Sequence, residues 1–147
     1  MPRIDPSIFE HEIQTYPDAK PVRQKLRLVN PCKATAVKAE FEKLLKAGFI
    51  YPIALTKWVS NHVPVDNKKG TIRVCTDFRD LNKACPKDIY PTPFIDQIID
   101  ACVGSEVFSF MDGFSGYNQI QIKPEDQHKI SFICPLGTFA YKKCPLH

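Results

Sequence analysis

The sequence predicts an α+β fold in which mainly antiparallel strands pack on helices. Three observations lead to this class. Two segments carry apolar residues at helical spacing, and several shorter segments alternate apolar with polar residues. Proline or glycine separates most of these segments, since the chain contains 13 prolines and 6 glycines. Helical and extended segments do not alternate regularly along the chain, which argues against a parallel α/β sheet.

The first helix is expected to run from residue 31 to about residue 47. Asn30 can cap its start, Pro31 suits its first turn, and Gly48 can end it. Its apolar side chains recur at helical spacing on one face, and the first three of them are assigned to the core. They are Val37, Phe41, Leu44 and Leu45.

Extended segments follow this helix. Residues 49–51 suggest a short strand, and residues 62–65 and 71–76 flank a polar turn at residues 66–70. The pattern predicts a β-hairpin with cations at its tip, Lys68 among them.

A second amphipathic helix is expected between Pro93 and Gly104. Its apolar side chains again share one face, and those of Ile95 and Ile98 are assigned to the core. The residues of that face are Ile95, Ile98, Ile99 and Cys102.

Four further strands complete the pattern. Residues 107–111 form a short apolar run, which predicts a buried strand that delivers Asp112 at its carboxyl end. Residues 120–122 alternate as a strand does. Residues 129–134 and 138–142 flank a turn with proline and glycine, which predicts a second hairpin.

Residues 1–30 carry little periodicity and are predicted to form an extended arm or a connection from an upstream region, whereas residues 31–147 form one domain. Eight cations and two anions lie between Lys20 and Lys46. This excess of positive charge suits a surface that binds phosphates, but it is equally typical of a solvated helix face.

The composition excludes some classes of protein. No amino-terminal signal peptide is visible and no apolar run approaches membrane-spanning length, so no membrane partner is expected. The six cysteines show no Cys-x-x-Cys spacing, which disfavours a zinc site and suits reduced thiols in the cytosol or nucleus.

The densest chemical pattern surrounds Asp112. A carboxylate at the end of an apolar strand is costly unless it is hydrogen-bonded or binds a cation. Small residues follow it, and their backbone N–H groups can approach a phosphate. This pattern alone leaves two interpretations open, a turn residue or a ligand of a metal ion in nucleotidyl transfer.

The segment Asp112-Gly-Phe-Ser-Gly-Tyr-Asn-Gln-Ile resembles the first catalytic-aspartate motif of reverse transcriptases from gypsy-type LTR retrotransposons. Arg73-Val-Cys-Thr-Asp-Phe-Arg-Asp-Leu-Asn-Lys-Ala-Cys-Pro-Lys-Asp88 is similar to the fingers motif that precedes it in that family. The end of the first helix, Ser131-Phe132 and the hairpin through Tyr141 also fall in the expected order. The resemblance implies an incomplete right-hand polymerase fold, with fingers and part of the palm.

The family implies a role for each matching position. Asp112 would be the catalytic residue and, with the Gly113 carbonyl, would bind Mg²⁺ or Mn²⁺. The nucleotide-binding positions would be Arg73, Lys68, Gly113, Phe114, Ser115, Gly116 and Tyr117. The template-binding positions would be Asp77, Arg79 and Asn82. The partners implied are an RNA or DNA template–primer and a deoxynucleoside triphosphate, with downstream polymerase, RNase H and integrase regions in a parent polyprotein.

Several of these positions have a plainer interpretation. Arg73 and Arg79 suit exposed strand residues, Tyr117 suits core packing, and Lys68 suits an exposed turn. One position also departs from the family, which usually carries a lysine where Asp66 stands.

The family's second motif, with two adjacent aspartates, would lie beyond Tyr141 and is absent before His147. We therefore expect a domain truncated at its carboxyl end, with no polymerase activity as an isolated chain, because the two metal ions need more than one carboxylate. The alternatives are a non-catalytic nucleic-acid-binding module and a decayed transposon relic.

Overall fold

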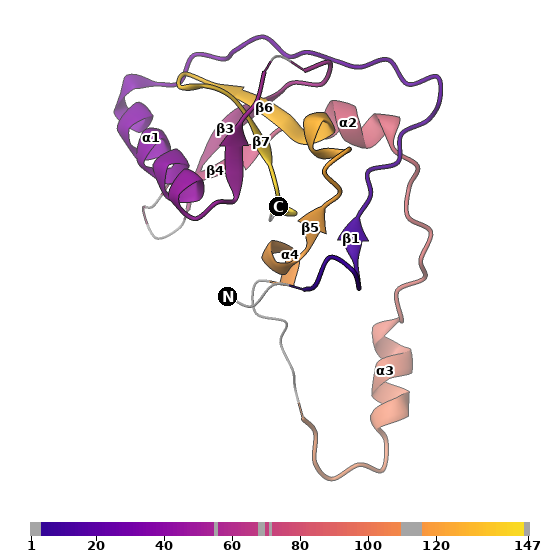
Figure 1. Ribbon diagram of the computed structural model, residues 1–147. Helices are drawn as coiled ribbons and strands as arrows, with labels where there is room; N and C mark the ends of the chain where they lie inside the picture. Colours follow the sequence, from indigo (N-terminus) through magenta and orange to yellow (C-terminus); the bar gives the residue numbers. More distant parts are fainter. Residues whose placement is uncertain (1–3, 55, 68–69, 71, 110–115, 146–147) are drawn as a thin grey trace.

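The computed structural model describes residues 4–54, 56–67, 70, 72–109 and 116–145. Within these residues the strands form a five-stranded sheet, ordered β2-β7-β6-β3-β4, and a two-stranded sheet of β1 and β5. Figure 1 shows α1 beside the larger sheet and α3 on a long excursion of the chain away from both sheets. The mixture of helices with a mostly antiparallel sheet confirms the α+β class.

The larger sheet is antiparallel except where β3 pairs with β6. Both predicted hairpins are present in it, β3–β4 and β6–β7. Its strands are β2 (Ile50–Pro52), β3 (Ser60–Asp66), β4 (Ile72–Thr76), β6 (Ser131–Cys134) and β7 (Gly137–Tyr141).

Helix α1 (Pro31–Lys46) begins and ends as its sequence predicts. The side-chain oxygen of Asn30 accepts a hydrogen bond from the amide of Cys32 at 3.0 Å, and Gly48 has a φ of 70°, which favours glycine. Val37 and Phe41 are buried and Leu44 packs partly against them. Leu45 is 44% exposed, because it lies at the edge of the apolar face.

The core lies between α1 and the larger sheet. Phe132 on β6 is fully buried, and its ring centroid lies 5.7 Å from that of Phe41 and 5.0 Å from that of Tyr141. Ile122 and Ile130 belong to the same core cluster, and each is less than 5% exposed.

Helix α3 (Ile95–Cys102) forms where it was predicted, but the assignment of its apolar face to the core is wrong. Ile95 is 73% exposed, Ile98 48% and Ile99 59%. The sequence pattern identifies an amphipathic helix, but burial also needs a partner surface, and α3 lies apart from the sheets (Figure 1).

The buried strand predicted at residues 107–111 is also wrong where the structure describes it. Residues 107–109 are irregular, with Val107 84% and Phe108 48% exposed. No described strand pairs with this segment, and a strand without a hydrogen-bonded neighbour is not stable. Residues 110 and 111 lie outside the described residues.

The amino-terminal arm, residues 4–30, packs along the rest of the chain. Strand β1 (Glu10–His11) pairs in parallel with β5 (Gln121–Ile122). Ile13 is buried in the core, and its amide donates a 2.9 Å hydrogen bond to Oδ2 of Asp126. The extended character of the arm agrees with its sequence, while a domain boundary at residue 30 stays a prediction.

Three short helices were not predicted. They are α2 (Arg79–Ala84), α4 (Gly116–Gln119) and the 3-10 helix η1 (Gln127–Ile130). Each has six residues or fewer, too few for an apolar period to stand out in the sequence.

Candidate nucleic-acid interface

Five of the residues with predicted roles lie outside the described part of the chain. They are Lys68, Asp112, Gly113, Phe114 and Ser115. The described candidates are Arg73 on β4, Asp77 at the end of that strand, Arg79 and Asn82 on α2, and Gly116 and Tyr117 on α4.

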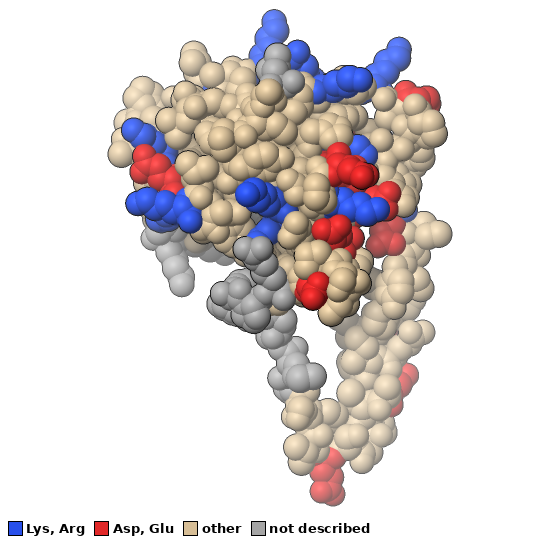
Figure 2. Space-filling model, viewed as in Figure 1, with Lys and Arg blue, Asp and Glu red and all other residues tan. Residues whose placement is uncertain are grey.

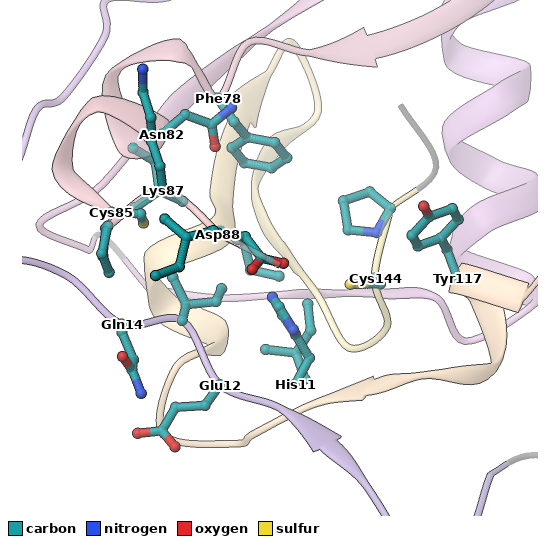
Figure 3. Close-up of a pocket in the computed structure, with 17 residues that line it drawn as sticks. His11, Glu12, Gln14, Phe78, Asn82, Cys85, Lys87, Asp88, Tyr117 and Cys144 are labelled. Carbon is teal, nitrogen blue, oxygen red and sulfur yellow. The ribbon is translucent and has the colours of Figure 1, made fainter. Parts of the chain in front are cut away.

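Asn82 and Tyr117 line one cavity of about 830 Å³. In Figure 3 they stand on opposite sides of it, with Phe78 above and His11 below. Tyr117 is 61% exposed, so it is not a core residue. The structure therefore brings together two side chains that the sequence assigned to separate motifs, one for template and one for nucleotide.

The cavity is lined by four parts of the chain, and Tyr117, Ile122 and Ile130 represent one of them. The arm contributes four consecutive residues from His11 to Gln14, and the segment after α2 contributes residues 85–89. Cys144 follows β7 and lies near Tyr117 in Figure 3. Burial raises the pKa of the Cys144 thiol, and the same cause raises the pKa of Cys85, although the nearby Lys129 ammonium opposes it. Both thiols are therefore held in their protonated form.

Asp77 is almost completely covered, with a side-chain exposure of 4%. Arg79 binds both of its carboxylate oxygens, through Nε at 2.7 Å and Nη2 at 2.6 Å. This bidentate hydrogen bond lowers the pKa of Asp77 to about 2, against the opposing effect of burial. Asp77 is therefore ionised and is engaged within the protein.

A second guanidinium approaches the same carboxylate from the arm. Nη2 of Arg27 lies 3.6 Å from Oδ2 of Asp77. The backbone amide of Arg27 donates a 3.1 Å hydrogen bond to Oδ1 of Asn61, a side chain that is 2% exposed on β3. The arm is thus fixed to β3 at the point where it meets Asp77.

Gln24 fastens the same part of the arm. Its Nε2 donates to Oδ2 of Asp80 at 2.9 Å, and its Oε1 accepts from the amide of Asn61 at 3.0 Å. The amide of Asp77 in turn donates to the carbonyl of Asn61 at 2.8 Å. One polar network therefore connects the arm, β3 and the start of α2.

Arg73 lies opposite Val65 in the β3–β4 hairpin and is exposed. Its neighbours Ile72 and Val74 pack against the core, and side chains alternate along a strand, so Arg73 projects from the opposite face of the sheet. Its placement is that of an exposed strand residue that a ligand can reach.

Asp66, the position that departs from the expected family pattern, has a partner in this chain. Nζ of Lys33 lies 2.6 Å from its Oδ2, and this ion pair connects the end of β3 to the first turn of α1. Asp66 therefore has a structural contact that does not depend on a ligand.

Exposed cations gather on the arm beside this network. Arg23, Lys25 and Arg27 are all exposed. Figure 2 shows Lys and Arg side chains along the upper edge of the molecule, where Figure 1 places the arm. The acidic side chains in that view lie mainly lower down, so the upper edge is a positively charged surface.

The sequence did not identify Gln24, Arg27 or Asn61 as site residues. The sequence shows an excess of cations between residues 20 and 46, but it does not show that Arg27 is the one that approaches Asp77. Among the described residues, no group of three or more His, Cys, Asp or Glu could hold a metal ion. None of the described helices has both the length and the apolar character needed to cross a membrane.

Comparison with known proteins finds homologues among transposon polyproteins. The chain is 36% identical over 116 residues to the Tf2-3 and Tf2-4 transposon polyproteins of Schizosaccharomyces pombe. The match covers 78% of this chain and 9% of each polyprotein. The chain thus spans less than a tenth of the length of these relatives. No protein-family model matches the sequence.

Two solved structures with the same fold are of foamy viral proteins. The native protease–reverse transcriptase of prototype foamy virus superposes with a TM-score of 0.73 at 22% identity, over 92% of this chain and 18% of the viral chain. A foamy viral protease–reverse transcriptase in complex with double-stranded DNA gives a TM-score of 0.73 at 16% identity, over 98% of this chain and 29% of the viral chain. At these identities the likeness establishes the fold.

Proposed function

We propose that this reverse-transcriptase-related chain, a homologue of transposon polyproteins, forms the fingers and part of the palm of an RNA-directed DNA polymerase. The observation that carries the proposal is the shared cavity of Asn82 and Tyr117, because it joins a template position to a nucleotide position. The substrates would be a template–primer and a deoxynucleoside triphosphate. Downstream polymerase, RNase H and integrase regions would belong to the parent polyprotein.

Each described residue has a role that its placement supports. Tyr117 would pack its exposed ring against the sugar of the incoming nucleotide, where a 2′-hydroxyl would collide with it. Asn82 and Arg79 would contact the template from α2. Arg73 would lie over the base and a phosphate, which its planar guanidinium suits. Asp77 would orient the Arg79 side chain toward the template, since both of its carboxylate oxygens accept hydrogen bonds from Arg79.

The proposed metal site rests on the type of ligand. The carboxylate of Asp112 and the carbonyl of Gly113 are hard oxygen donors, which Mg²⁺ and Mn²⁺ prefer. The bound ions would stabilise charge on the attacking and leaving oxygens. The backbone of Phe114, Ser115 and Gly116 would lie along the triphosphate.

A binding experiment tests the proposal. The chain is titrated into a fluorescent template–primer with a 5′ template overhang, and the dissociation constant is taken from anisotropy at 0.05 M salt. Asn82→Ala and Tyr117→Ala should each weaken binding by roughly fivefold, the loss of about 1 kcal/mol expected for one nucleotide contact. Tyr90→Ala is the matched control, because Tyr90 is 78% exposed and lies outside the residues lining the cavity. Equal binding by all four proteins would refute the assignment of the cavity.

A non-catalytic nucleic-acid-binding module is the second candidate, and the exposed cations of the arm favour it. Such a module would bind through phosphates and would not need the cavity. Binding that weakens steeply with salt but is unaffected by Asn82→Ala and Tyr117→Ala would favour the module over the polymerase.

A further inference from the structure

Two arginines from distant parts of the chain converge on one carboxylate. Arg79 binds Asp77 at 2.6 and 2.7 Å, and Arg27 approaches it to 3.6 Å. Two guanidiniums therefore share one carboxylate, and these three side chains together carry a net charge of about one. The carboxylate of Asp80 also interacts electrostatically with Arg79. The carboxylate is 4% exposed, whereas the Arg27 and Arg79 side chains are 54% and 75% exposed. The buried anion thus holds two guanidiniums that face solvent.

Both guanidiniums keep donors for a further anion. Each has five N–H groups in a planar fork, and Arg79 directs two of them at Asp77. The geometry of this fork matches a phosphate as well as a carboxylate. A phosphodiester that bridges Arg27 and Arg79 would neutralise the remaining charge of the three side chains.

The arm presents Arg27 before any ligand arrives. The backbone amide of Arg27 is hydrogen-bonded to Asn61. Three residues earlier, the side chain of Gln24 is hydrogen-bonded to Asp80 and Asn61. The backbone of Arg23 also pairs with that of Val59, the residue before β3, in an isolated parallel β-bridge. A side chain on a fixed backbone loses less entropy when it binds, so this arrangement favours a binding role.

The residues beside Arg27 and Arg79 indicate which ligand these two side chains would bind. Arg79 and Asn82 are three residues apart on α2, so they lie on one side of the helix. Arg27 in turn shares the Asp77 carboxylate with Arg79, so Asn82, Arg79 and Arg27 belong to neighbouring parts of one surface. Arg23 and Lys25 add two more exposed cations to the arm.

We infer that Arg27 and Arg79, held by Asp77, form a clamp for the sugar–phosphate backbone of a single-stranded template, so that the amino-terminal arm is part of the nucleic-acid site. The inference rests on the proposed function and adds the arm to it. Arg27 contacts the ligand directly, and Asp77 is a positioning residue.

The test compares a template–primer that has a 5′ single-stranded template overhang with a blunt duplex of the same sequence. Arg27→Ala should weaken binding of the overhang substrate about fivefold at 0.1 M salt, because one phosphate contact on a single strand changes the slope of log K against log salt by about 0.7. The blunt duplex should bind unchanged. Arg27→Lys should retain the wild-type slope, since it keeps the charge.

Two control variants separate this role from others. Lys43→Ala removes an exposed cation of α1 that is paired with Glu40 at 3.2 Å, and it should leave both substrates unaffected. Gln24→Ala loosens the arm without removing a charge, so it should leave the salt slope unchanged. If Gln24→Ala weakens binding of the overhang substrate and lowers the salt slope as Arg27→Ala does, the role of Arg27 is structural and the inference is overturned.

The remaining outcomes are also decisive. If Arg27→Ala binds the overhang substrate with the wild-type dissociation constant and the wild-type salt slope, the inference is overturned and the proposed function stands. Failure of the wild-type chain to bind either substrate at 0.05 M salt overturns the proposed function as well. If Arg27→Ala unfolds, as seen in its circular dichroism, Arg27→Gln replaces it as the variant that removes the charge, with the same expected and contradicting results.

Discussion

Acid should destabilise this protein through one buried histidine, His62 on β3. The side chain is 6% exposed, and its ring lies 4.5 Å from the ring of Phe41 and 4.1 Å from that of Phe132, between centroids. Nδ1 lies 3.3 Å from the hydroxyl of Thr76, and Nε2 has no hydrogen-bond partner among the described residues. A proton added to this ring would place an unpaired charge in the core.

The size of the effect follows from the pKa of His62. Burial lowers it from 6.5 to about 4, although a hydrogen bond with the Cys75 backbone opposes the shift. The folded state therefore binds fewer protons than the unfolded state between these values, so the stabilisation is complete above pH 6.5 and is lost as the pH falls toward 4. Between pH 7.5 and pH 4.5 the free energy of unfolding should fall by about 2.5 kcal/mol from this group alone.

Urea unfolding at a series of pH values measures this fall. Trp58 is the single tryptophan of the chain and is 7% exposed, so its fluorescence reports the transition. His62→Phe should remove most of the pH dependence in this range, because phenylalanine fills the aromatic site without a titrating group. His128→Gln is the control, since His128 is exposed and its variant should retain the dependence. An unchanged pH dependence in His62→Phe would refute the reasoning.

Three further predictions concern the fold. Ile98→Ser on the exposed face of α3 should change the free energy of unfolding by less than about 0.5 kcal/mol, whereas Ile122→Ala in the core should cost about 2–5 kcal/mol, both by urea unfolding. Asp126→Ala removes the hydrogen-bond acceptor of the Ile13 amide, so trypsin should cleave the arm several times faster than in the wild type. Mass spectrometry follows the cleavage, and equal rates would contradict the packing of the arm. Asp66→Ala breaks the ion pair between β3 and α1, and its cost in urea unfolding should not exceed about 1 kcal/mol because the pair is partly exposed.

Local chemistry made several elements predictable from the sequence. Helix α1 carries its own start and stop signals in Asn30, Pro31 and Gly48, and each acts within the helix or beside it. The β3–β4 hairpin likewise follows from two extended runs around a polar turn. Such signals need no knowledge of the rest of the chain, so the positions of these elements were predicted closely.

Burial was predictable only where a partner surface existed. Val37 on α1 and Ile98 on α3 show the same helical spacing, yet Val37 is 3% exposed and Ile98 is 48% exposed. Periodicity identifies an apolar face, but it contains no information about what covers that face. The wrong core assignments of Ile95 and Ile98 have this cause.

Contacts between candidate site residues were predictable only where the residues stand close together in sequence. Asp77 and Arg79 are two positions apart and were both identified, and the structure joins them directly. Arg27 meets the same carboxylate from fifty positions away, so no local pattern could reveal the contact. A run of cations is typical of a solvated surface, and only the fold distinguishes Arg27 within it.

The pairing of the arm with β5 has a consequence for how the protein is made. The hydrogen bond from Ile13 to Asp126 joins residues that are 113 positions apart, and β1 pairs with β5 over a similar separation. At the usual rates of synthesis, the residues of the arm are translated roughly 5–20 s before their partners. During that interval Ile13 has no core to enter, and closure of so long a loop is intrinsically slow. Docking of the arm is therefore expected to be a late step in folding.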